Sequence, residues 1–294
     1  MLNNKTLFYN DEELFHALQI RKSTRTYNGV ELKAEHIDLI KQYLQDKERM
    51  TGFLENSFRI KFFNGGNIDK DIATYGYIKE FKAILMAVSK PEPLALFEMA
   101  YVLHGLVLQL TQADVQTVWI GGAFNHQDAM EASDLLNGEI VAAVVPLGYE
   151  SNKKRLLFDY VVPLVLGAKN RKENVYFDTD FYTSLDVTKT KFSKALDFAR
   201  RAPSAKNKQP WRVVIDERNN KIHMYAKFSL RDEVGTGRKQ YSCPPEYLDL
   251  GTYYKSLELG LKHIGLQGKI VINKPDIEIP KDADIEYIAT WVED

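Results

Sequence analysis

Two arginines flank a serine in the segment Arg21-Lys22-Ser23-Thr24-Arg25. On an extended chain, side chains two and four residues apart point the same way, so Arg21, Ser23 and Arg25 would face one ligand. Two guanidinium groups and a hydroxyl would offer a phosphate forked, permanently charged donors plus one O–H. A solvated basic turn is the plainer interpretation of so short a pattern. The segment therefore indicates a phosphate site only when another motif accompanies it.

A second motif, APSAKNKQPW, occupies residues 202–211 between a predicted helix and a predicted strand. Pro203 is expected to end the helix. Ser204 and Ala205 are small enough for another group to approach the backbone, and the Asn207 amide carries both a donor and an acceptor. This donor and acceptor would match the hydrogen-bond acceptors and donors that alternate along the edge of a flavin pyrimidine ring. The alternative is a plain loop whose polar side chains satisfy turn carbonyls.

The other residues that could bind a metal, act as a nucleophile or stack on a ligand form no clear site. No two of the six histidines have metal-ligand spacing such as H-E-x-x-H, and one cysteine, Cys243, cannot form a thiolate zinc cluster. Ser204 has no histidine near it in the sequence to activate it as a nucleophile. Trp119, Phe124 and Trp211 could stack on a flavin, although core packing is their default role. No metal site is predicted.

The elements that must position these motifs are those of an α+β protein. Apolar spacing predicts helices at 11–20, 34–46, 93–113 and 190–201. Alternation and β-branched runs predict strands at 58–63, 139–147 and 212–215. Residues 115–120 are expected to be a short strand or an extended link. The irregular segment 227–247, with Gly235 and Gly237, is either a lid over the site or a surface loop.

The pattern of elements restarts in the second half of the chain. A shift of 151 residues superposes Leu106, Leu108 and Leu110 on Leu257, Leu259 and Leu261. Shifts of 153 and 155 superpose 58–60 on 211–213, and Ile37, Ile40 and Leu44 on Phe192, Ala195 and Ala199. Shared leucines alone mean little, but three similar offsets in one order predict a duplication. The expected halves are 1–160 and 161–294, packed as an intrachain pseudo-dimer.

Together, and in this order, the two motifs resemble the flavin-dependent nitroreductases. RKSTRTY at 21–27 resembles the phosphate-binding start of that family, and APSAKNKQPW resembles its flavin-edge loop almost residue for residue. The resemblance continues through VWIGGAF at 118–124 and VVPLGY at 144–149 and covers most of the chain. Each half holds only one of the two motifs, whereas an ordinary member holds both and forms its sites in a homodimer. The chain is similar to the fused subfamily called "putative TM nitroreductases", which implies one FMN site between the halves and a degenerate second site.

The resemblance also implies roles for the matched residues. The FMN phosphate would be held by Arg21, Ser23 and Arg25, with Lys153, Lys154 and Arg155 as further cations. The isoalloxazine would be contacted by Pro203, Ser204, Ala205 and Asn207, with a backbone N–H of Gly121 or Gly122 near flavin N5 and Lys79 near the pyrimidine edge.

The implied activity is that of an FMN-dependent oxidoreductase. NADH or NADPH would reduce the flavin by hydride transfer, and a small molecule such as a nitroaromatic or a quinone would accept the electrons. The flavin carries the chemistry, so no dedicated catalytic acid or base is expected. A non-catalytic FMN carrier or redox-sensing protein is one alternative, and a pseudoenzyme without cofactor is another. The sequence does not identify the natural acceptor or distinguish NADH from NADPH as the donor. It also leaves open whether flavin breakdown or dehalogenation replaces the reduction of a nitroaromatic or a quinone.

Composition narrows the partners and the location. The chain has 294 residues, of which 45% are hydrophobic, enough for one large domain or two smaller ones. Its 39 basic and 40 acidic residues leave a formal charge of −1, which gives no global field for nucleic acid or an anionic membrane. The longest apolar run is shorter than the roughly 20 residues of a membrane span. We expect a cytoplasmic protein with no nucleic-acid or membrane partner, either a monomeric pseudo-dimer or a homodimer.

Overall fold

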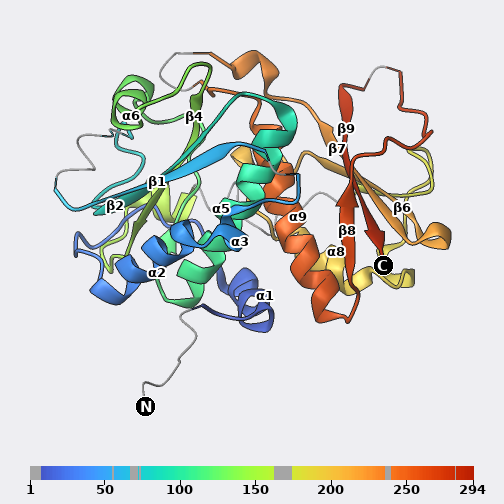
Figure 1. Cartoon of the computed structure of the whole chain (residues 1–294), viewed down its shortest axis with the longest axis horizontal. Helices are drawn as coiled ribbons and strands as arrows, with labels where there is room; N and C mark the ends of the chain where they lie inside the picture. Colours follow the sequence, from blue (N-terminus) through green and yellow to red (C-terminus); the bar gives the residue numbers. More distant parts are fainter. Residues whose placement is uncertain are drawn as a thin grey trace.

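Two β-sheets stand on either side of a central pair of long helices (Figure 1). This computed structural model describes residues 8–54, 56–66, 72, 74–161, 174–235, 240–281 and 283–294. The first sheet is antiparallel, in the order β1 (Phe58–Asn64), β2 (Ala83–Ser89), β4 (Ile140–Gly148) and β3 (Gln116–Thr117). The second has the order β5 (Tyr176–Asp178), β6 (Trp211–Asp216), β7 (Lys221–Lys227), β9 (Ile285–Glu293) and β8 (Gly268–Val271). The α+β class is confirmed.

The central helices are α5 (Pro93–Gln112) and α9 (Pro245–His263), and each carries a proline in its first turn. They approach closely at Gly251, where a Cβ would lie 2.2 Å from the carbonyl oxygen of Phe97. By length and composition alone α5 could span a membrane, but 89% of its most apolar window is buried inside the protein. Its apolar character is therefore explained by packing in the core.

The two sheets share one topology. In the second sheet β6-β7-β9-β8 repeats the order of β1-β2-β4-β3, with β5 added in parallel at the edge of β6. The inner pairs of both sheets also carry a register shift, at Ala87/Val88 and at Met224/Tyr225. One hydrophobic cluster contains residues of both sheets and of both central helices, from Leu32 to Trp291. The two sheets and the two central helices therefore share a core.

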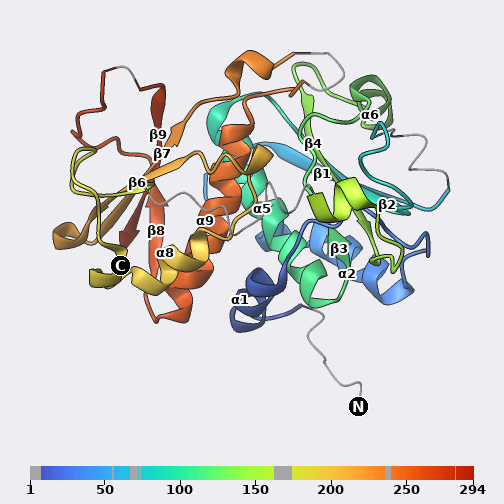
Figure 2. The same ribbon diagram turned by 180° about the vertical axis from the view of Figure 1, so that it is seen from behind.

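The remaining helical segments lie around this frame. They are α1 (Asp11–Ile20), α2 (Ala34–Gln45), α3 (Lys47–Met50), α6 (His126–Ala132), a π-helical segment (Leu156–Val161), α8 (Ser193–Ala199) and short 3-10 turns at Val187–Lys189, Ala205–Asn207, Glu217–Asn219 and Arg231–Glu233. Both views show α1 beside the ends of α5 and α9 (Figure 2). There Phe15 stacks on His263 with ring centroids 3.8 Å apart, so α1 is fixed against the second half.

The predicted helices and strands are confirmed within a few residues. The segment 115–120 contains only the two-residue strand β3, followed by one bridge between Ile120 and Val144. The lid-or-loop segment 227–247 contains a 3-10 turn and the start of α9; its Gly237 lies outside the described residues.

Candidate functional site

The Arg/Ser/Arg segment is extended, as its proposed chemistry requires. α1 ends at Ile20, and Ser23 then pairs with Thr117 of β3, where the Thr24 N–H donates to the Thr117 carbonyl at 3.0 Å. Further along, the Lys79 N–H donates to the Arg25 carbonyl at 3.1 Å. Backbone hydrogen bonds on both sides thus hold the segment against the edge of the first sheet.

The Ser/Asn loop is held in an unusual backbone conformation. Lys206, Asn207 and Gln209 have φ values of 49°, 52° and 50°, in the left-handed region that non-glycine residues seldom adopt. The Ser204 hydroxyl accepts a hydrogen bond from the Gln209 N–H at 3.1 Å. Such conformations persist where surrounding contacts fix them, and they cluster at functional sites.

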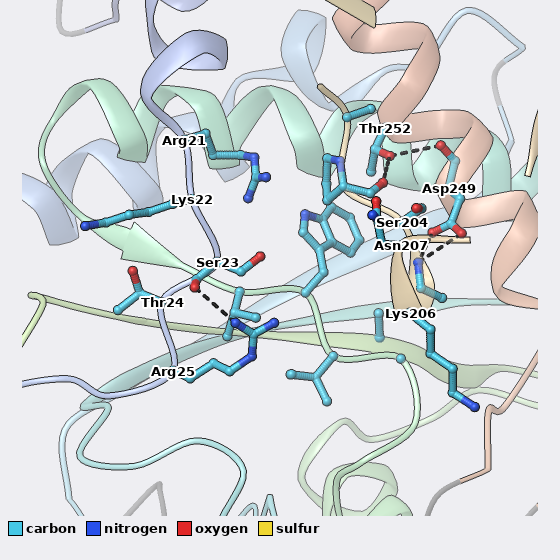
Figure 3. Close-up of a pocket in the computed structure, with 18 of the residues that line it drawn as sticks. Arg21, Lys22, Ser23, Thr24, Arg25, Ser204, Lys206, Asn207, Asp249 and Thr252 are labelled. Carbon is cyan, nitrogen blue, oxygen red and sulfur yellow. Dashed lines mark hydrogen bonds between the residues drawn. The ribbon is translucent and has the colours of Figure 1, made fainter. Parts of the chain in front are cut away.

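Helix α9 supplies further anchors for this loop. The Thr252 hydroxyl donates to the Pro203 carbonyl at 2.9 Å, and the Ala205 N–H donates to both carboxyl oxygens of Asp249 at 3.0 Å (Figure 3). The loop is therefore tied to the central helix of its own half.

The two segments line opposite walls of one cavity of about 900 Å³ (Figure 3). This volume is at the upper end of the range of small-molecule and cofactor sites. Ten of the thirteen residues predicted to bind the cofactor line it: Arg21, Ser23, Arg25, Gly121, Gly122, Lys154, Pro203, Ser204, Ala205 and Asn207. Residues before position 161 and residues after position 200 therefore contribute different walls of the cavity.

The structure does not bring Lys79, Lys153 and Arg155 into this cavity. The side chains of Lys79 and Lys153 are exposed. Lys79 contacts the Arg/Ser/Arg segment through its backbone, whose N–H donates to the Arg25 carbonyl and whose carbonyl accepts from the Tyr27 N–H. The Arg155 guanidinium donates to the carbonyls of Arg25, Gly76 and Tyr77 at 2.7–2.8 Å and to the Thr26 hydroxyl at 2.7 Å. Because these acceptors occupy it, Arg155 positions the backbone around Arg25.

Positive charge gathers at the Arg/Ser/Arg end of the cavity. Arg21, Lys22, Arg25 and Lys154 line it there, while the Glu150 carboxylate forms ion pairs with Lys22 and Lys154. Burial lowers the pKa of Arg25, and the nearby Asp159 carboxylate acts in the opposite direction. A guanidinium nevertheless keeps its charge at neutral pH. This end is therefore suited to an anionic group.

Two residues of the cavity wall carry a buried polar atom. The Thr24 hydroxyl and the Trp119 indole nitrogen belong to residues that line the cavity, and neither atom has a hydrogen-bond partner among the described residues. The Thr24 side chain lies on the opposite side of the extended backbone from that of Ser23, so its hydroxyl does not face the cavity (Figure 3). With a cationic end for a phosphate and an amide-bearing loop for a ring edge, the residues present fit FMN.

A segment of the second half crosses to the first half beside this cavity. Glu233 and Tyr241 line the cavity, and Glu233 forms an ion pair with Lys206 of the loop. The His126 ring, at the start of α6, contacts the Gln240 carbonyl at 3.1 Å and the Ser242 hydroxyl at 2.9 Å. The described part of 227–247 therefore contributes to the wall of the cavity.

Sequence reasoning missed several residues of the site. Asp249 and Thr252 lie within α9, which also carries other charged residues, and nothing in the spacing of that helix marks these two. The signal that the sequence offers for Asp249 is an acidic residue flanked by two leucines, Leu248 and Leu250.

Comparison with known proteins places the chain in a family. A profile of the family described as "Putative TM nitroreductase" matches residues 13–259. Among solved structures, a "putative nitroreductase" from Thermotoga maritima MSB8 has a TM-score of 0.58 at 15% identity, covering 97% of this chain and 95% of that chain.

Shorter structures match about half of the chain. A nitroreductase with bound FMN from Bacteroides fragilis NCTC 9343 is 13% identical, with a TM-score of 0.40, and covers 49% of this chain and 91% of its own. A nitroreductase family protein from Clostridium difficile 630 is 16% identical, with a TM-score of 0.39, and covers 49% of this chain and 86% of its own. No curated protein matches. Because the family profile matches most of the residues of this chain, the chain belongs to the "Putative TM nitroreductase" family.

Proposed function

We propose that the protein is an FMN-dependent oxidoreductase that takes a hydride from NADH or NADPH and passes the electrons to a small molecule such as a nitroaromatic or a quinone. The observation that carries this proposal is the common cavity of two motifs about 180 residues apart, Arg21–Arg25 and 203–207. Membership of a nitroreductase family supports it independently. A cytoplasmic location, with access to both nicotinamide donors, is part of the same proposal.

Each wall of the cavity then has its own task. Arg21, Ser23, Arg25 and Lys154 would bind the phosphate of FMN, because charged donors bind a dianion more strongly than neutral ones. The loop 203–207 would contact the isoalloxazine, and a backbone N–H at Gly121 or Gly122 would face flavin N5. FMN supplies the two-electron redox chemistry, while the chain supplies binding, orientation and exclusion of water.

The halves 1–160 and 161–294 are proposed to be a fused pseudo-dimer with one FMN per chain. The shared strand order of the two sheets supports the duplication. In the first half, the place that corresponds to the wall of α9 is occupied by aromatic rings. Phe53 packs there against Phe97, Tyr101 and Tyr254, with centroid distances of 5.0–5.5 Å. A second cofactor would have to displace this cluster.

The first experiment is an absorption spectrum of the purified protein, before and after anaerobic addition of NADH and then NADPH. We expect a yellow protein that releases one FMN per chain on denaturation and is bleached by at least one donor. Bound flavin that neither donor bleaches would contradict the oxidoreductase and favour an FMN carrier or sensor. A colourless protein that does not take up added FMN would contradict both.

A further inference from the structure

Asp249 places a buried carboxyl group in the wall of the cavity. It lies in the second turn of α9, is 6% exposed, and lines the cavity together with Leu248 and Thr252. Its carboxyl group points toward the loop 203–207 (Figure 3). Apart from anchoring that loop through the Ala205 N–H, it has no role in the binding proposed above.

Among the described residues, no cation forms a hydrogen bond or an ion pair with Asp249: Arg201 and Lys206, which also line the cavity, form ion pairs with Asp197 and Glu233. The hydrogen-bond partner of Asp249 among the described residues is one backbone N–H, that of Ala205. Glu246 on α9, and Tyr241 and Cys243 just before α9, interact with it electrostatically. A buried carboxylate without a cation is costly, so the neutral acid is favoured. Burial, with a smaller effect from Glu246, raises the pKa of Asp249 well above its usual range.

Glu98, which corresponds to Asp249 in the proposed duplication, has different hydrogen-bond partners. Glu98 lies 151 positions earlier, on α5, and is also buried. Its two carboxyl oxygens accept from separate backbone donors, the Leu54 N–H and the Asn56 N–H, and it does not line the cavity. Asp249 receives one N–H for two oxygens. One oxygen can therefore carry a proton while the other accepts from Ala205.

We propose that Asp249 is the proton donor when the acceptor is reduced. This inference rests on the proposed function, because the hydride must come from reduced FMN. With a quinone, the hydride brings one hydrogen and two electrons, and the second oxygen takes the proton from the Asp249 O–H. The product is a hydroquinone, Asp249 is left as a carboxylate, and water returns the proton. One hydride and one proton balance the reduction.

The decisive variant is Asp249→Asn, whose side-chain oxygen still accepts from the Ala205 N–H but which has no acidic proton to transfer. Stopped-flow spectroscopy separates the two half-reactions. We expect reduction by NADH to keep its wild-type rate, because hydride transfer to the flavin needs no acid. Reoxidation by a benzoquinone should slow about 100-fold, in the range of general acid catalysis. Glu98→Gln is the matched control and should leave both rates unchanged.

The pH profile distinguishes a proton donor from a merely structural residue. The wild-type rate of reoxidation should fall as the pH rises through the pKa of Asp249, whereas that of Asp249→Asn should stay flat. Infrared spectroscopy adds a readout that needs no turnover. One carbonyl band of a protonated carboxylic acid that is present in the wild type and in Glu98→Gln should be lost in Asp249→Asn.

The outcomes separate the two proposals. Failure of NADH and NADPH to reduce bound flavin overturns the proposed function, while the infrared band still reports whether Asp249 is protonated. Normal reduction combined with wild-type reoxidation in Asp249→Asn overturns the proton donor. If that variant does not fold, a pH-independent reoxidation of the wild-type protein, or the lack of a protonated-acid band, overturns it equally.

Discussion

The ring of Tyr241 lies against Gly121, so closely that a Cβ on this glycine would come within 3.0 Å of the Tyr241 Cδ1 atom. The backbone of Tyr241 is fixed on both sides: its N–H donates to the Glu233 carbonyl at 2.9 Å, and its carbonyl accepts from the Gly235 N–H at 2.8 Å. Gly121 belongs to the first half and Tyr241 to the second. Because both residues line the cavity, this contact joins the halves at the place where the cofactor is proposed to bind.

We predict that Gly121→Ala weakens FMN binding about tenfold, because the added methyl group must displace the ring of Tyr241 or the cofactor. Overpacking of this kind costs about 1–3 kcal/mol. Titration of the apoprotein with FMN, followed by flavin fluorescence, measures the effect. In a Tyr241→Leu background, where the ring is gone, the same glycine change should cost less. An equal cost in both backgrounds would show that the contact does not limit binding.

The double variant Arg21→Ala with Arg25→Ala should fold and yet bind FMN at least about 100-fold more weakly. Each lost charge-assisted hydrogen bond to the phosphate costs about 1.5–3 kcal/mol. The control is Lys189→Ala with Arg218→Ala, which removes two exposed positive charges outside the cavity. Flavin content after reconstitution and circular dichroism are the measurements. Full FMN occupancy of the double variant would contradict the assignment of the phosphate site.

Local patterns were sufficient to predict much of the fold. Residues 93–113 and 58–63 match α5 and β1 closely because the periodicity of each segment reflects the face that it buries. β2 was not predicted because all seven of its residues are buried, which removes the alternation of a half-buried strand. β8 has only four residues and depends on β9 for its pairing, so its own sequence carries little signal.

The site shows a similar division. Both motifs that line the cavity could be predicted because each is a compact run whose residue types suggest a ligand. The basic run 153–155 could be recognised, but the direction of each side chain depends on distant acceptors. Only Lys154 reaches the cavity. Asp249 could not be predicted, since no local pattern says which loop packs on that turn of α9.

We predict that Arg155 is needed for the stability of the protein without FMN. Its guanidinium joins the Arg25 carbonyl to the Gly76 and Tyr77 carbonyls, so Arg155→Ala leaves several acceptors without a donor. The expected loss is roughly 2–4 kcal/mol in the free energy of unfolding, measured by urea denaturation of the apoprotein. Lys153→Ala, which removes an exposed neighbouring charge, is the control. If Arg155→Ala lowers only FMN affinity and leaves the apoprotein as stable as before, Arg155 is a phosphate ligand after all.

His223 gives the protein a defined sensitivity to acid. The residue is 4% exposed, its Nδ1 lies 2.8 Å from the Thr290 hydroxyl, and burial lowers its pKa from 6.5 to about 4. The unfolded chain therefore takes up a proton near pH 6.5 that the folded protein refuses until about pH 4. Stability from this residue is fully present above pH 6.5, is lost progressively as the pH falls to about 4, and amounts to about 3 kcal/mol.

We predict that urea unfolding of His223→Gln depends less steeply on pH across this window than that of the wild type. His16→Gln, at an exposed position, should keep the wild-type slope. A slope in His223→Gln equal to that of the wild type would mean that His223 is already protonated in the folded protein within this range.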